Sequence, residues 1–186
     1  VINSGNANAA TGEPGRHDAE QICACVADQL AGVDATQVQP FSTGVIGERL
    51  NVPLLQQAAQ KSTAELKPDG WLAAAKAIMT TDTVAKLVSR RVTLSTGDVV
   101  ITGMAKGSGM IKPDMATMLA FVACNAKVAP HLMPVLTKKL ADRSFNRISV
   151  DGDTSTNDCF MLSATGVSDT AEIDSLGHQD FPALLA

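Results

Sequence analysis

The strongest constraint on the fold is a predicted β-hairpin near the middle of the chain. Two runs rich in β-branched residues, VAKLVSRRVTL (residues 84–94) and VVITGMA (99–105), flank the polar turn STGD (95–98). Such runs on both sides of a short turn that contains glycine favour two antiparallel strands. The sequence therefore predicts an antiparallel strand pair here.

Helical and strand patterns surround this hairpin. Helices are predicted at residues 18–30, 53–66, 69–79 and 130–145, with Asn51 as an N-cap. Further strands are predicted at the N-terminus, in 36–47, after Thr117, and on both sides of a polar turn within 148–166. Hairpins mixed with helices, without strict alternation, favour an α/β layered sandwich with mixed or antiparallel sheets and flanking helices over a doubly wound sheet.

Composition limits the class of protein. The 186 residues are 45% hydrophobic, which is enough for one sizeable core, and the net charge is −4. Without a basic stripe, a nucleic-acid partner is not expected. No apolar run approaches the roughly 18 residues that a membrane-spanning helix needs. We expect a soluble cytoplasmic protein that forms a single structural unit.

Both ends of the chain look cut. The sequence opens without methionine on a predicted strand, and it stops at QDFPALLA, which resembles the first turn of an apolar helix. We therefore expect an internal fragment of a longer protein.

Cysteine and histidine give little sign of a site. Four scattered cysteines are predicted to be reduced core thiols rather than zinc ligands or disulfide partners, although Cys124 or Cys159 as a thiolate nucleophile stays an alternative. His17, His131 and His178 lie far apart in sequence, in no metal-binding pattern, and are predicted to be surface or capping residues. No metal site is expected.

The glycine-rich segment GMAKGSG (103–109) has two interpretations. It lacks the Gly-Lys-Ser/Thr ending of a phosphate-binding loop. It is either an ordinary connection with a solvated lysine or a place where glycines let the backbone approach a site into which Lys106 projects.

Thr117, in KPDMATMLAF (112–121), has no histidine near it in sequence that could activate its hydroxyl. The simplest interpretation is a buried strand threonine. The alternative is cleavage of the bond after Ala116, because the freed α-amino group of Thr117 could then act as the base. Such an amine has a pKa of roughly 7.7 to 8.0, which suits a general base.

Five longer motifs lie in order along nearly the whole chain. They are NSGNANAATG (3–12), STGVIGERL (42–50), TTDT (80–83), GMAKGSGMIKPDMATMLAF (103–121) and RISVDGDTSTND (147–158). Together they resemble the bifunctional ornithine acetyltransferase family of arginine biosynthesis. The motifs are too long and specific for chance similarity. The resemblance implies an N-terminal-nucleophile-like α/β fold.

The resemblance also implies a reaction, because family members cut themselves before the threonine of an ATML motif. The cut here would fall between Ala116 and Thr117, making 1–116 the end of an α chain and 117–186 the start of a β chain. The threonine takes acetyl from N-acetylornithine, releases ornithine and acetylates glutamate. Some members also use acetyl-CoA, and no other cofactor is implied. The cut chains are expected to form an α/β heterotetramer.

The resemblance assigns further site residues. Thr43 and Gly44 would form the oxyanion hole through a hydroxyl and a backbone N–H. Thr80 and Lys106, with Thr117, would bind substrate, and Lys106 suits a carboxylate or could lower the pKa of a neighbouring amine. Residues 151–158 match the family but receive no chemical role, so we regard them as scaffold near the site.

Two other functions stay open. The first is an N-terminal-nucleophile amidohydrolase that gives its acyl group to water. The second is a non-catalytic fragment or small-ligand binding module in which GMAKGSG binds phosphate and Thr117 lies in the core. The family's other substrate-binding residues, an acidic one and a polar pair, would lie beyond residue 186.

Overall fold

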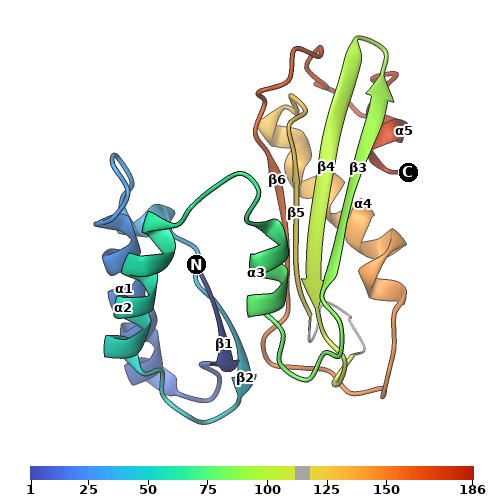
Figure 1. Cartoon of the computed structure of the whole chain (residues 1–186). Helices are drawn as coiled ribbons and strands as arrows, with labels where there is room; N and C mark the ends of the chain where they lie inside the picture. The colour runs from blue at the N-terminus through green and yellow to red at the C-terminus, as the bar shows by residue number, and fades with distance from the viewer. Residues whose placement is uncertain (112–117) are drawn as a thin grey trace. The chain divides into compact units, whose positions relative to one another are not determined.

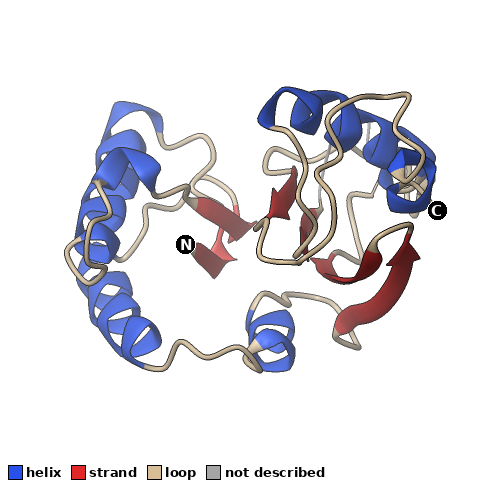
Figure 2. Cartoon of the chain, turned by 90° about the horizontal axis from the view of Figure 1, so that it is seen from above, coloured by secondary structure: helices blue, strands red, loops and turns tan. Residues whose placement is uncertain are grey.

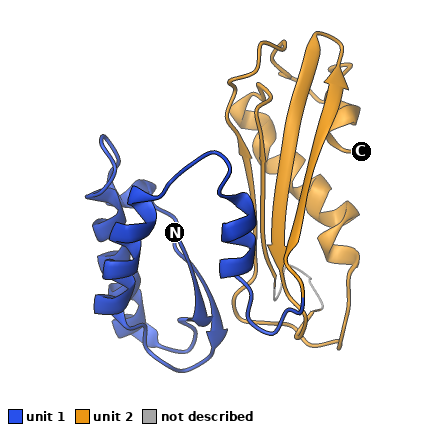
Figure 3. Ribbon diagram, in the orientation of Figure 1, with its two compact units in different colours: residues 1–83 blue, residues 84–186 orange. Residues whose placement is uncertain are grey.

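The structure is a computed structural model that describes residues 1–111 and 118–186. Whereas the sequence predicts a single structural unit, backbone contacts group the chain into two, Val1–Thr83 and Val84–Ala186 (Figure 3). The predicted division between residues 116 and 117 is a covalent cut rather than a packing boundary. It stays a prediction.

The first unit combines two short strands with helices (Figure 1). Its elements are β1 (Ile2–Asn6), α1 (Gly12–Ala27), the 3-10 helix η1 (Ala35–Gln37), β2 (Phe41–Val45), α2 (Val52–Ala64) and α3 (Trp71–Ala77). β1 and β2 pair in parallel, and α1 packs against α2. The predicted N-cap of α2 is confirmed, because the Asn51 side chain accepts a hydrogen bond from the Leu54 N–H at 3.2 Å.

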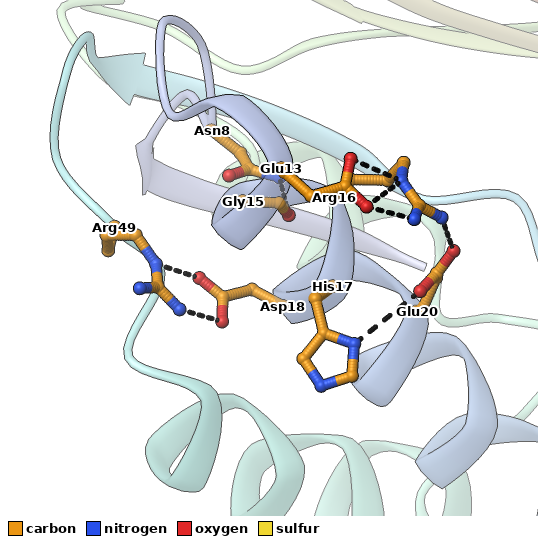
Figure 4. Close-up of polar contacts among 8 residues, drawn as sticks. All are labelled: Asn8, Glu13, Gly15, Arg16, His17, Asp18, Glu20 and Arg49. Carbon is orange, nitrogen blue, oxygen red and sulfur yellow. Dashed lines mark hydrogen bonds and ion pairs between the residues drawn. The ribbon is translucent and has the colours of Figure 1, made fainter.

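Helix α1 begins at Gly12, earlier than the predicted start at residue 18. The polar residues just before Gly12 form hydrogen bonds with one another and with the first turn of α1, which lengthens the helix at its N-terminus. Asn8 donates from its side-chain amide to the Gly15 carbonyl at 2.9 Å (Figure 4), and Thr11 donates to the Asn8 side-chain oxygen at 2.9 Å. The apolar spacing that starts at Ile22 therefore marks only the C-terminal part of a longer helix.

The second unit is built on a four-stranded sheet in the order β3-β4-β5-β6. The strands are β3 (Lys86–Leu94), β4 (Gly97–Lys106), β5 (Leu119–Cys124) and β6 (Cys159–Ala164). β3 and β4 form the predicted hairpin, in which Leu94 pairs with Gly97. β4 and β5 are antiparallel, whereas β5 and β6 are parallel. The prediction of an α/β fold with mixed sheets and flanking helices is confirmed.

Helices cover one face of this sheet (Figure 2). They are η2 (Pro130–Leu132), α4 (Met133–Arg143), η3 (Phe145–Arg147) and α5 (Phe181–Leu184). A parallel strand pair needs a crossover connection, and α4 lies in the segment that joins β5 to β6. The core between sheet and helices comprises Leu94, Val99, Cys124, Ala126, Ala129, Leu132, Leu136, Ile173, Phe181 and Leu184.

One predicted strand is wrong. Residues 148–150, expected to be extended before a polar turn, form a loop instead. The Val150 N–H donates one backbone hydrogen bond to the Ile111 carbonyl at 2.7 Å, and the described residues show no ladder there. A β-branched tripeptide without a paired neighbour does not form a strand.

Within 1–111 and 118–186, no helix is long and apolar enough to cross a membrane.

Candidate functional site

Thr43 and Gly44 lie on β2, where they pair in register with Ser4 and Gly5 of β1. Thr43 is buried, with 8% of its surface exposed. Gly44 has a φ of +133°, and a Cβ built there would lie 2.3 Å from the Gly5 carbonyl carbon and oxygen. Packing against β1 thus already requires glycine at position 44. The predicted role of both residues in an oxyanion hole stays a prediction.

Thr80 follows α3 in a tight polar turn. Its backbone N–H donates to the Asp82 carboxylate at 3.4 Å, and Asp82 is buried while Thr80 is exposed. A buried aspartate that accepts a nearby N–H is the usual way to fix such a turn. The hydrogen bond to Asp82 thus fixes the backbone of Thr80. Its role in substrate binding stays a prediction.

Lys106 ends β4, directly opposite Leu119 at the start of β5. Only 5% of its surface is exposed, which rules out the alternative interpretation of a solvated lysine. Gly103 and Lys106 both belong to β4, so GMAKGSG does not form the phosphate-binding loop considered above. A buried lysine needs opposite charge or hydrogen-bond acceptors around it.

Asp151 connects two of the sequence motifs. Its carboxylate accepts hydrogen bonds from the backbone N–H groups of Met110 at 2.5 Å and Ile111 at 2.9 Å. These bonds lower the pKa of the Asp151 carboxyl, because they stabilise its charged form. The polar loop after α4 thereby holds the segment after β4, which agrees with the scaffold role expected for residues 151–158.

Asp158 does not fit that scaffold role. Both of its carboxylate oxygens are buried, and neither accepts a hydrogen bond within the part of the chain that the structure describes. It immediately precedes β6, whose first residue, Cys159, donates its backbone N–H to the Met118 carbonyl at 2.7 Å. Native structures rarely leave a buried carboxylate without a partner.

The environment of Asp158 changes its protonation. Burial raises the pKa of its carboxyl to about 6, while the backbone N–H of Met118 and the charge of Lys106 oppose this rise. Since neither oxygen accepts a hydrogen bond from the described residues, the Met118 N–H acts on the carboxyl as a nearby dipole. The sequence offered only the match of DGDTSTND to the family as a signal for this residue.

Ala116 and Thr117, the predicted cleavage site, lie outside the described residues. In the sequence, Thr117 precedes the first residue of β5 by two positions. Thr43, Gly44 and Thr80 belong to the first unit, whereas Lys106 and Asp158 belong to the second. The assembly of these residues into one site therefore stays a prediction.

The cysteines and histidines provide no rival site. All four cysteines are free, and burial raises the pKa of Cys124 and of Cys159, which disfavours a thiolate nucleophile. His17 and His131 are exposed, and the His178 ring accepts the Asp180 N–H at 3.2 Å. The described residues contain no cluster of His, Cys, Asp or Glu that could hold a metal ion.

An open depression of about 430 Å³ lies at the opposite end of β4 from Lys106. Its lining includes Gly97 and Asp98 at the start of β4, and Asn125 just after β5. It contains none of the predicted site residues. Of the predicted site residues, Lys106 lies at the other end of β4.

Comparison with known proteins agrees with the motifs. The ArgJ family model matches residues 1–185. Two proteins named arginine biosynthesis bifunctional protein ArgJ, from Psychrobacter arcticus and Pseudomonas syringae pv. tomato, are each 50% identical over 184 residues. These matches include 99% of this chain but only 45% of each relative. The chain thus spans about half the length of these relatives.

A solved structure supports the fold. The crystal structure of arginine biosynthesis bifunctional protein ArgJ from Bacillus halodurans matches with a TM-score of 0.54 and 38% identity. The match covers 63% of this chain and 59% of that one. Because the family model and the relatives match along nearly its whole length, this chain belongs to the ArgJ family.

Proposed function

We propose that the full-length protein containing this chain is a self-processing acetyltransferase of arginine biosynthesis, which moves acetyl from N-acetylornithine to glutamate. The observation that carries the proposal is the match of the ArgJ family model to residues 1–185, together with 50% identity to proteins named for arginine biosynthesis. The motif around Ala116 and Thr117 lies inside this match.

The reaction we propose begins with self-cleavage. The Thr117 hydroxyl attacks the Ala116 carbonyl carbon, the peptide C–N bond breaks, and an ester joins the two residues. Water then hydrolyses this ester and leaves a free α-amino group on Thr117. That amine is the general base of the mature enzyme, since no histidine lies nearby in the sequence.

Acetyl transfer then proceeds in two halves. The Thr117 oxygen attacks the acetamide carbonyl of N-acetylornithine, while the α-amine accepts the hydroxyl proton and delivers it to the departing ornithine nitrogen. The glutamate nitrogen next attacks the acetyl-threonine ester, and threonine leaves as the hydroxyl. The negative charge on the attacked oxygen would lie against the Thr43 hydroxyl and the Gly44 N–H.

Lys106 and Thr80 would bind substrate. The Lys106 ammonium is a suitable partner for an amino-acid carboxylate, and its burial strengthens such an attraction. The reaction requires no other cofactor, although the acetyl group could also be supplied by acetyl-CoA in the same assay. We propose an α/β heterotetramer and a cytoplasmic location for this activity.

The decisive test is an acetyl-transfer assay on the full-length protein. Acetylglutamate should form when N-acetylornithine and glutamate are supplied together. Thr117→Ala should remain uncut by intact mass and should lose transfer by at least about a thousandfold, because the nucleophile is gone. Release of free acetate alone would indicate an amidohydrolase, and transfer by the uncut variant would exclude Thr117 as the nucleophile.

A further inference from the structure

Asp158 carries an unusual combination of burial and charge. Both oxygens are shielded from solvent, and they accept no hydrogen bond from residues 1–111 or 118–186. An ionised carboxylate in such a place destabilises the folded protein unless another group offsets its lost hydration. Asp158 therefore does not contribute to stability in its charged form.

Two neighbouring groups show where this charge acts. Its field reaches the Lys106 ammonium at the end of β4, and the backbone N–H of Met118 immediately before β5. These strand ends adjoin β6, because Leu119 pairs with both Lys106 and Cys159. Met118 also directly follows the predicted nucleophile in the sequence. The carboxylate thus lies where three strand ends meet.

We propose that Asp158 is a positioning residue for the acetyl-transfer reaction, whose buried carboxylate keeps the Lys106 ammonium charged and oriented to bind a substrate carboxylate. The proposal rests on the function proposed above. Lys106 is itself buried, and burial alone favours a neutral amine over an ammonium. A nearby negative charge opposes that preference, so the Asp158 carboxylate supports the charged form of Lys106.

The other titratable groups around Asp158 follow from its position. Cys159 is its sequence neighbour on β6, and the Asp158 charge adds to burial in raising the pKa of that thiol. Lys106 contributes the positive charge from β4. Lys112 and Asp114 lie outside the described residues. The substitution tested must therefore change the charge of Asp158 alone.

Asp158→Asn in the full-length protein removes the charge and keeps the shape. Without the Asp158 charge, Lys106 should lose its proton at a lower pH than in the wild-type protein. The KM for glutamate should therefore rise relative to wild type as the pH increases, by roughly tenfold at pH 9. Below pH 6 the two proteins should converge, because wild-type Asp158 is then itself protonated.

A stability measurement separates this role from a structural one. The folded pKa of Asp158, about 6, lies above its ordinary value of 3.8, so the ionised carboxylate lowers stability as pH rises through this interval. Asp158→Asn should consequently melt higher than wild type at pH 8, by about 2 °C or more. Asp153→Asn, an exposed aspartate of the same loop, should change neither KM nor Tm.

A double variant tests whether Asp158 acts through Lys106. In a Lys106→Met background, Asp158→Asn should have little further effect on KM, because no charge remains to be held. Additive losses would overturn the proposal, as would an Asp158→Asn variant with a lower Tm or with an unchanged KM at pH 9. Absence of acetyl transfer by the wild-type protein would overturn the proposed function instead, and the Tm comparison would still be measurable.

Discussion

Asp18 in the first unit and Asp158 in the second both have buried carboxylate groups, but their surroundings differ. Asp18 is 2% exposed and forms two hydrogen bonds with the Arg49 guanidinium, at 2.6 Å each (Figure 4). The two carboxylate oxygens of Asp158 are also shielded from solvent, but they accept no hydrogen bond from the described residues. One carboxylate has its lost hydration replaced, and the other does not.

This difference gives the two carboxyls opposite pKa shifts. The hydrogen bonds from Arg49 lower the pKa of Asp18, whereas burial raises that of Asp158. Asp18 therefore stabilises the folded chain above its ordinary pKa, and this contribution is lost as pH falls through its lowered value. Ionisation of Asp158 instead lowers the stability of the folded chain as the pH rises from about 4 to about 6. A carboxylate whose charge lowers the stability of the fold is a better candidate for a functional residue than one whose charge raises it.

The largest expected effect concerns the close approach of β1 and β2 in the first unit. Gly44→Ala would place a Cβ 2.3 Å from the Gly5 backbone at a φ of +133°, which should destabilise the protein by about 3 kcal/mol or more. Gly47→Ala is the matched control. Its φ of +87° is also positive, but nothing lies within 4 Å of the new Cβ, so about 1 to 2 kcal/mol is expected.

Urea unfolding of the two glycine variants separates backbone conformation from steric overlap. Equal losses of free energy would mean that the close approach of β1 and β2 relaxes easily. The packing explanation for glycine at position 44 would then be wrong, and its conformation alone would account for the residue.

Arg49→Met tests whether pairing alone distinguishes the two aspartates. Asp18 would become a buried carboxylate without its partner, as Asp158 is, and its pKa should move above the ordinary value. We expect Tm to fall by about 5 °C at pH 7. Lowering the pH from 7 to 5 should then raise the Tm of the variant relative to wild type.

Arg16→Met provides the control for that substitution. Arg16 pairs with Glu13 and Glu20 on the exposed surface of α1, so its loss should change Tm little. If Arg49→Met showed the same pH dependence as wild type, the hydrogen bonds from Arg49 would not be what keeps Asp18 charged.

The smallest effect concerns a paired aspartate in the second unit. Asp180 accepts hydrogen bonds from the Ser95 N–H at 2.8 Å and from its hydroxyl at 2.6 Å, which lower the pKa of its carboxyl. Ser95→Ala keeps the backbone bond and loses the other, so Tm should drop by about 2 °C. A rise in Tm would show that pairing does not explain the stabilising aspartates.

The sequence alone determined the features that depend on near neighbours. Alternation and turn chemistry located the hairpin of β3 and β4, and Asn51 marked the start of α2. The long motifs identified the family, which the comparisons confirm. The local pattern wrongly predicted a strand at residues 148–150. A strand forms only beside a pairing partner, and a local sequence pattern does not show where that partner lies.

Only the tertiary structure decided what the individual polar residues experience. Asp18 and Arg49 are separated by 31 positions, Gly44 must be glycine because Gly5 lies against it, and Lys106 is buried rather than solvated. Asp158 looked like turn scaffold in the sequence, but its two carboxylate oxygens are buried and accept no hydrogen bond from the described residues. Burial and electrostatic environment are set by residues distant in the chain, so the sequence could name the chemistry but not the protonation states that would control it.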